Sequence, residues 1–166
     1  AAFRQKTASD SARDLHYLRL KPHTMIPYKR HTLSNGLTVA VNRDRQSKLA
    51  AVNILYKVGA RNEDPARTGF AHLFEHLMFR GTRDVPDFDL PVQMACGDNN
   101  AFTNNDYTDF YITLPKDNIE TALWLEADRM TGLDISPEAL ETEKRVVIEE
   151  YKQRYLCLLY TSDAAD

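Results

Sequence analysis

Apolar and polar residues alternate with a period of two in several short stretches of the chain. The alternation covers 31–41, interrupted by a Ser34-Asn35-Gly36 turn, then 49–58, and later 99–103 and 107–114 around Asn104-Asn105. A period of two is typical of half-buried strands, and Asn- and Gly-containing turns are typical of tight connections. The first three strands therefore predict a meander, and the last two predict a hairpin.

Four longer segments predict helices, over 68–80, 86–94, 117–130 and 136–154. Gly81 follows the first of them and suits the left-handed conformation that ends many helices. Asp117 and Glu120 have the spacing of a capping box at the start of the third, and Ser136-Pro137 pairs a cap residue with a proline in the first turn of the fourth. This order of strands and helices predicts an α+β fold, with helices packed on one face of a mostly antiparallel sheet.

Composition narrows the class of protein. The chain has 166 residues, with 21 Lys and Arg against 24 Asp and Glu, for a formal charge of -3. This size fits one soluble globular domain, and the absence of a basic surplus predicts no nucleic-acid partner. No apolar run approaches the roughly 18 to 20 residues of a membrane helix, so no membrane span is predicted. The first ten residues lack the pattern of a signal peptide, which leaves the compartment open, with bacterial periplasm and cytoplasm both compatible.

The two ends differ from the rest of the chain. Residues 1–28 are polar and without a sustained period, so we interpret them as a lead-in segment. Residues 157–166, CLLYTSDAAD, resemble the translation of a sequencing-library adapter, with a short natural tail as the alternative. On this interpretation 29–156 is an incomplete domain. Cys96 and Cys157 form no C-x-x-C pair, and we expect Cys96 to be a buried small residue without a role in catalysis.

The segment His72-Leu73-Phe74-Glu75-His76 carries the chemistry. On a helix, His72, Glu75 and His76 fall within roughly 100° of one another, with the apolar residues on the opposite side. Two imidazoles one turn apart can hold one Zn²⁺, and a carboxylate between them is a candidate general base. Ordinary surface residues of an amphipathic helix are the alternative interpretation.

A third metal ligand is expected on the last predicted helix. Glu143 and Glu150 are seven residues apart, so they share a stripe of this helix, roughly 10 Å apart along its axis. We expect this stripe to be buried, together with Leu140, Val146 and Val147. Glu149 lies on the other side, which makes Glu150 the better ligand, because a buried carboxylate needs a partner. Glu143 fits either a carboxylate paired with an Arg or a ligand histidine, or a supporting residue of the metal site.

The H-x-x-E-H order, with a glutamate roughly seventy residues downstream, resembles the pitrilysin family of inverzincin metallopeptidases, which includes insulin-degrading enzyme and mitochondrial processing peptidase. Further segments are similar to that family's N-terminal domain, above all in bacterial members: 58–82, 95–115, 125–130 and 141–156. The resemblance implies a zinc endopeptidase with His72, His76 and Glu150 as ligands of one Zn²⁺. It implies Glu75 as the base that activates a zinc-bound water, and Glu143 as the supporting acidic residue.

The same resemblance implies how peptides or unfolded segments are bound. Asn100-Ala101-Phe102 matches the family's segment that takes substrate as an added strand on a sheet edge. Phe79 and Phe102 either wall an apolar pocket or are ordinary core aromatics. A second homologous domain or subunit completes the site in that family, so we expect the 166-residue chain alone to be inactive. A non-catalytic subunit and an inert fragment are the alternatives.

Overall fold

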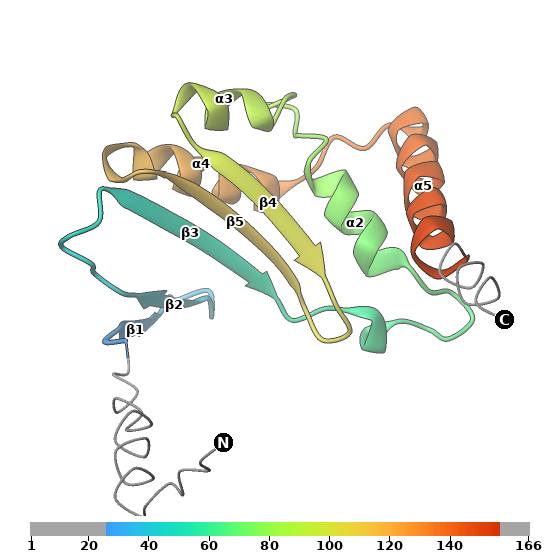
Figure 1. Cartoon of the computed structure of the whole chain (residues 1–166), viewed down its shortest axis with the longest axis horizontal. Coiled ribbons are helices and arrows are strands. Elements are labelled where there is room, and N and C mark those ends of the chain that lie inside the picture. Colours follow the sequence, from blue (N-terminus) through green and yellow to red (C-terminus); the bar gives the residue numbers. More distant parts are fainter. Residues whose placement is uncertain (1–25, 157–166) are drawn as a thin grey trace, which may run out of the picture. The chain divides into compact units, whose positions relative to one another are not determined.

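The structure is a computed structural model that describes residues 26–156 (Figure 1). Most of the predicted lead-in and all of the predicted tail at 157–166 lie outside the described residues. The described chain divides into two compact units, with the boundary between Gln46 and Ser47. Within its described residues, no helix is both long and apolar enough to cross a membrane.

The first unit contains one hairpin. Strands β1 (Lys29–Thr32) and β2 (Thr38–Val41) pair antiparallel, with Arg30 opposite Ala40. Gly36 has a φ of 88° in the turn, a conformation that glycine adopts without steric cost. The two strands predicted around the Ser34-Asn35-Gly36 turn are confirmed, but the predicted meander is wrong. The next strand joins a different sheet, because its partner is a strand about sixty residues further along the chain.

The second unit is built on a three-stranded antiparallel sheet of order β3-β5-β4. Its strands are β3 (Leu49–Tyr56), β4 (Asp98–Thr103) and β5 (Thr108–Pro115). Its helices are α2 (Phe70–Met78), α3 (Asp89–Met94), α4 (Ile119–Thr131) and α5 (Pro137–Tyr151), and α5 continues as a π-helical turn over Lys152–Leu156. Two short 3-10 turns, Ala60–Asn62 and Lys116–Asn118, precede α2 and α4.

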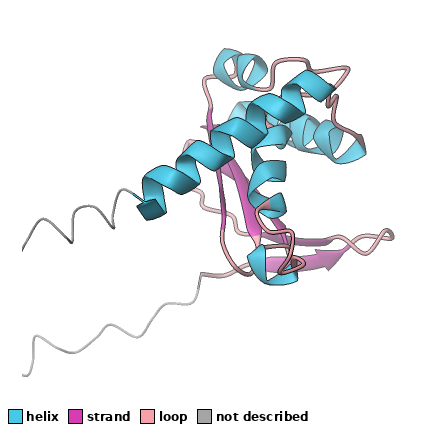
Figure 2. Ribbon diagram, turned by 90° about the vertical axis from the view of Figure 1, so that its right-hand side faces the viewer, coloured by secondary structure: helices cyan, strands magenta, loops and turns pink. Residues whose placement is uncertain are grey.

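One face of this sheet carries the core. Val52 of β3 lies opposite Ile112 of β5, and both are buried together with Leu114. Ala122 and Leu125 of α4 pack against them from one side of the sheet, with further core residues before, in and directly after α3, namely Val85, Phe88, Val92 and Ala95. Helix α2 packs on β4 and β5, and α5 packs on α2 (Figures 1 and 2). The predicted α+β fold with helices on one sheet face is confirmed.

Two of the three predicted helix-end features are confirmed, the Ser136 cap and the glycine after α2. Ser136 caps α5, because its hydroxyl accepts a hydrogen bond from the Ala139 N–H at 3.1 Å, and Gly81 has a φ of 97° after α2. The predicted Asp117 capping box is wrong, since Asn118 occupies the cap position and its side chain makes no cap bond. The Asn118 amide instead donates to the Ala95 carbonyl at 3.0 Å, which ties the start of α4 to the end of α3.

Cys96 is exposed, so the prediction that it is buried is wrong. It has a φ of 55° and its N–H donates to the Gln93 carbonyl at 2.9 Å in the turn after α3. The buried small residue at this point is its neighbour, Ala95, with 7% exposure. With Cys96 in the left-handed conformation, the buried residue of this turn is the one before it, Ala95.

Helix α4 contains a buried ion pair between Glu126 and Arg129. Arg129 and Glu126 are 3% and 2% exposed, and the guanidinium makes two hydrogen bonds to the carboxylate, at 2.8 and 2.5 Å. The guanidinium also stacks on the Phe110 ring at 4.2 Å and on the Phe88 ring at 4.6 Å. Burial raises the pKa of Glu126, and the Arg129 charge opposes that rise. The pair is therefore costly to split, because either partner alone is a buried charge.

We expect Arg129→Met to lower the free energy of unfolding by about 3 to 5 kcal/mol, since Glu126 is then buried without its partner. The double variant Glu126→Leu/Arg129→Met removes both charges and should recover part of this loss. Lys144→Ala, which breaks the exposed pair with Glu141, is the control and should cost about 0 to 1 kcal/mol. Urea unfolding of the full chain measures all three. A double variant less stable than Arg129→Met would contradict this account.

Candidate metal centre

Helix α2 begins at a glycine and is capped from a distance. Gly69 has a φ of 94° at the cap position and offers no side chain to the free N–H groups of the first turn. The Glu63 carboxylate accepts instead from the Gly69 and Ala71 N–H groups, both at 2.7 Å. The negative charge of Glu63 also interacts favourably with the positive end of the helix dipole, which lies at the helix N-terminus. With Ala71 and Leu77 buried, this start orients the His72 side of α2 away from the core.

Three of the predicted site residues meet where α2 and α5 pack. The Nε2 atoms of His72 and His76 are 3.2 Å apart. The Glu150 Oε2 lies 3.2 Å from His72 Nε2, and its Oε1 lies 3.6 Å from His76 Nε2. Ligand atoms about 2.0 to 2.1 Å from a tetrahedral Zn²⁺ are about 3.3 to 3.4 Å from one another. The three side chains offer the donor types that zinc prefers, with one ligand atom from each lying within 4.8 Å of the others, and they form a candidate metal cluster.

The cluster is open on one side. The side chains of His72, His76 and Glu150 are 34%, 19% and 48% exposed, so a fourth ligand can reach the centre from solvent. The predicted burial of the α5 stripe is correct for Glu143 and wrong for Val146 and Glu150. Among the described elements α5 packs mainly on α2, which covers only part of this stripe.

Glu149 points away from the cluster and pairs with Lys152 at 2.7 Å. The Glu149 side chain is 62% exposed, and the Lys152 side chain is 50% exposed. The sequence-based choice of Glu150 over Glu149 agrees with this placement, although the expected reason, burial, does not apply.

Glu143 supports the cluster from behind. It is 8% exposed, and its Oε2 lies 3.1 Å from His76 Nδ1. Its Oε1 accepts from Nε and Nη2 of Arg80, both at 2.6 Å. The two expected partners of Glu143, an Arg and a ligand histidine, are thus both present. Arg80 itself was not identified from the sequence, although its position one turn after His76 places it on a neighbouring line of the helix.

Glu75 is held by the sheet. Its Oε2 accepts a hydrogen bond from the Thr103 hydroxyl at 2.5 Å, and that hydroxyl lies 3.2 Å from the Thr108 hydroxyl. Thr108 in turn donates to the Val58 carbonyl at 3.0 Å. Sequence analysis missed Thr103, because only the pairing of β4 with β5 and the packing of α2 show that it reaches Glu75.

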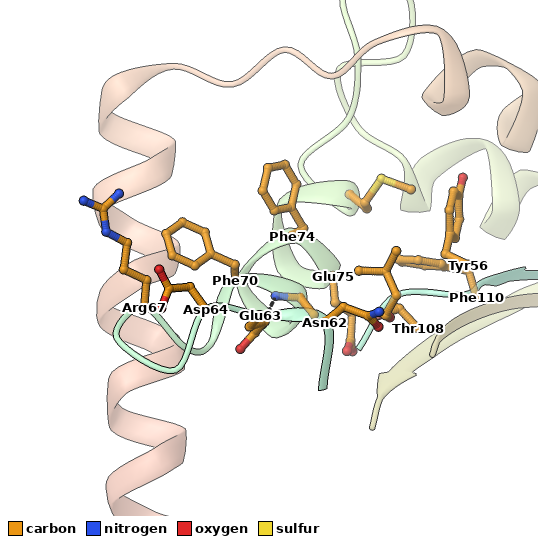
Figure 3. A pocket seen from close by; sticks show the side chains of 13 residues that line it. Tyr56, Asn62, Glu63, Asp64, Arg67, Phe70, Phe74, Glu75, Thr108 and Phe110 are labelled. Carbon is orange, nitrogen blue, oxygen red and sulfur yellow. Dashed lines mark hydrogen bonds between the residues drawn. The ribbon is translucent and has the colours of Figure 1, made fainter. Parts of the chain in front are cut away.

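Two cavities flank Glu75. The smaller, about 310 Å³, is lined by Glu75, His76, Phe79, Arg80 and Glu143. The larger, about 650 Å³, lies on the other flank of α2 and is mostly apolar, with Phe70, Phe74, Tyr56 and Phe110 among its lining residues (Figure 3). Its Tyr56 has a raised pKa, chiefly because the phenol is desolvated by burial. Glu75 therefore stands between the metal-ligand side and an apolar space.

The predicted substrate segment lies on an edge strand. Asn100, Ala101 and Phe102 belong to β4, which pairs with β5 alone among the described strands. The Ala101 N–H donates to the Asn100 Oδ1 at 2.8 Å. This part of the strand thus carries a backbone donor that a further strand can reach.

The two predicted pocket aromatics lie apart. Phe79 lines the smaller cavity and contacts the Phe88 and Phe110 rings. Phe102 is 42% exposed, packs edge-on against Tyr107, and is absent from the lining of that cavity. Successive residues of a strand face opposite sides, so Phe102 points away from the face on which Thr103 reaches α2. Of the two cavities beside Glu75, Phe79 lines the smaller and Phe102 lines neither.

Comparisons with known proteins agree on one family. The family model described as Insulinase (Peptidase family M16) matches residues 38–158. The chain is 36% identical over 126 residues to the zinc protease PqqE of Helicobacter pylori, an alignment that covers 74% of this chain and 28% of that protein. It is 33% identical over 124 residues to a probable mitochondrial-processing peptidase subunit beta of Schizosaccharomyces pombe, covering 74% of this chain and 27% of the relative.

Solved structures give the same picture. The crystal structure of a protease from Helicobacter pylori superposes with a TM-score of 0.74 and 34% identity, over 78% of this chain and 32% of that one. Pitrilysin superposes with a TM-score of 0.69 and 25% identity, over 77% of this chain and 14% of its own. The chain therefore spans about a third or less of the length of these relatives.

We expect Glu150→Gln to weaken zinc binding by at least 10-fold, because an amide oxygen replaces the charged ligand. Glu149→Gln is the matched control, since Glu149 lies one residue away and pairs with Lys152, and it should leave zinc binding unchanged. Competition between the full chain and a chromogenic chelator measures both. Equal retention of zinc in the two variants would contradict the assignment of the third ligand.

Proposed function

The chain belongs to the insulinase family of peptidases, family M16, and on that premise we propose that it forms the metal-binding part of a zinc-dependent endopeptidase. The substrates would be peptides or unfolded polypeptide segments. The observation that carries the proposal is the spacing of His72, His76 and Glu150, whose donor atoms approach the edge lengths of a zinc tetrahedron.

The three proposed ligands come from two helices. His72 and His76 are one turn apart on α2, and Glu150 approaches them from α5. Glu143 accepts from His76 Nδ1, so Nε2 would be the ring nitrogen that binds the metal. When bound, the ion supplies Lewis acidity, which polarises a carbonyl and lowers the pKa of a bound water.

Glu75 is the general base of the proposed reaction. Its carboxylate lines the same cavity as His76, and it makes no contact with the three ligands that would make it a fourth. The Thr103 hydroxyl binds Oε2 and so leaves Oε1 free to take a proton from the attacking water. The same carboxyl then passes that proton to the leaving amine.

The edge of β4 is proposed to bind substrate. A peptide that adds as a further strand exchanges backbone hydrogen bonds whatever its sequence, which suits a peptidase that acts on extended segments. The Ala101 N–H is one donor for such a strand, and the Asn100 side chain, which now accepts from it, would give way to the substrate carbonyl. Phe79, on the wall of the cavity beside Glu75, is proposed to contact a substrate side chain.

A second homologous domain or subunit is proposed to complete the site. The chain spans about 28% of the length of PqqE, and we propose that groups corresponding to the rest of that relative would bind substrate and stabilise the transition state. A non-catalytic subunit is the alternative function. The presence of both histidines, the base Glu75 and Glu150 in one arrangement favours the catalytic proposal.

We expect Glu75→Gln to retain zinc and to lose peptide hydrolysis by at least 100-fold, because the amide cannot accept the proton. The assay uses the full-length reading frame with a fluorogenic peptide, and metal analysis of the same preparations measures zinc. Glu138→Gln, an exposed position on the first turn of α5, is the control and should leave both unchanged. Loss of zinc in Glu75→Gln would show that Glu75 is a ligand rather than a base.

We also expect the 166-residue chain by itself to bind zinc without hydrolysing peptides. Each preorganised donor missing from an active site costs about 2.7 to 4 kcal/mol of transition-state stabilisation, or two to three powers of ten in rate. The measurement is peptide hydrolysis by the purified chain with and without a chelator. Chelator-sensitive hydrolysis that Glu75→Gln abolishes would mean that this chain holds a complete active site.

A further inference from the structure

We infer that Arg80 is a positioning residue of the proposed zinc site, which acts through Glu143 on the ring of His76. The inference rests on the proposed function, and it assigns a role to a side chain that touches none of the three proposed ligands directly. Arg80 holds the Glu143 carboxylate in place, and that carboxylate in turn orients the His76 ring.

The contact geometry gives each carboxylate oxygen one task. Nε and Nη2 of Arg80 both donate to Oε1 of Glu143, at 2.6 Å. Oε2 is left to accept from His76 Nδ1, at 3.1 Å. Because the guanidinium is a rigid planar fork, two donors on one oxygen restrict rotation of the carboxylate about its own axis. The second oxygen therefore stays aligned with the histidine ring.

Burial makes Glu143 depend on these two partners. Its side chain is 10% exposed, so solvent does not replace a lost hydrogen bond. Among the residues that the structure describes, Arg80 and His76 are the partners of this carboxylate. Without Arg80, the carboxylate can rotate or leave the histidine, and the Nδ1 side of His76 loses the support that orients Nε2 towards the metal.

Arg80 is the more exposed partner of this ion pair. Its side chain is 42% exposed, and it lies after the last turn of α2, next to Gly81. Removing it leaves the buried Glu143 carboxylate with His76 as its remaining partner, so we expect a loss of stability as well. Unfolding is therefore measured beside zinc binding, so that the two effects are separated.

The sign of the effect separates positioning from simple charge. A guanidinium near a zinc site repels the ion, and it screens the negative charge of Glu143. Removing the positive charge should therefore strengthen zinc binding if Coulomb forces alone act. Positioning predicts the opposite, that Arg80→Gln weakens binding. Arg80→Lys retains the charge but not the fork, so positioning predicts partial recovery.

The test is a double-mutant cycle on the full 166-residue chain, with zinc affinity measured by competition with a chromogenic chelator. The variants are Arg80→Gln, Glu143→Gln, the double variant and Arg80→Lys, with Arg83→Gln as the control at an exposed position three residues away. Urea unfolding of the metal-free proteins shows that each variant is folded.

We expect Arg80→Gln and Glu143→Gln each to weaken zinc binding by about 10-fold, as losses of histidine-supporting groups do. The double variant should be no weaker than Glu143→Gln alone, Arg80→Lys should lie between Arg80→Gln and the unsubstituted chain, and Arg83→Gln should have no effect. Nitrogen NMR of the histidine side chains should show a more mobile His76 ring in Arg80→Gln.

Several outcomes would overturn the inference. Unchanged or tighter zinc binding in Arg80→Gln excludes positioning, and losses that add in the double variant mean that Arg80 acts independently of Glu143. If Arg80→Gln is unfolded without metal, Arg80→Lys decides between the two roles. A folded Arg80→Lys that binds zinc less tightly supports positioning, and any other result makes Arg80 a structural residue. If the unsubstituted chain binds no zinc, the proposed function fails as well.

Discussion

The packing of α2 against α5 is the interaction on which the candidate site depends. The two histidines and the carboxylate of Glu150 come from helices whose relevant residues are more than seventy positions apart in sequence, and neither helix alone offers three ligands. The contact is polar at its centre, because Glu143 is buried between His76 and Arg80. A buried carboxylate is stable there since it has charged or hydrogen-bonding partners on both oxygens. The same group thus joins the helices and orients a proposed ligand.

The other side of α2 is anchored in the sheet. Thr103 on β4 binds Glu75, and Phe79 at the end of the helix packs on Phe88 and Phe110. Below these rings lies the guanidinium of Arg129, held by Glu126. A continuous set of contacts therefore runs from the core of α4 to the helix that carries two of the proposed metal ligands. Side chains locked in this way keep a site closer to its working geometry than side chains on loops do.

The apolar space beside Glu75 is only partly covered. Phe70 and Phe74 are about half exposed, at 49% and 51%, on the flank of α2 that lines the larger cavity. The amphipathic pattern of α2 identifies this flank as apolar, yet the described residues leave both rings half in solvent. An apolar flank beside a proposed base keeps water away from part of the carboxylate once it is covered.

Local spacing in the sequence was enough to predict α2, the shared face of His72, Glu75 and His76, the cap of α5 and the α+β class, because these follow from periodicities of two and 3.6 residues. It also placed Glu150 and Glu149 on different sides of α5, since a one-residue shift turns a side chain by about 100° on a helix, although the expected burial of Glu150 is wrong. Tertiary structure alone decided that β3 pairs with β5, that Thr103 reaches Glu75, that Arg80 holds Glu143, and that Cys96 is exposed. Those contacts join residues from elements far apart in the chain, and no local pattern encodes the distance between two elements before they pack.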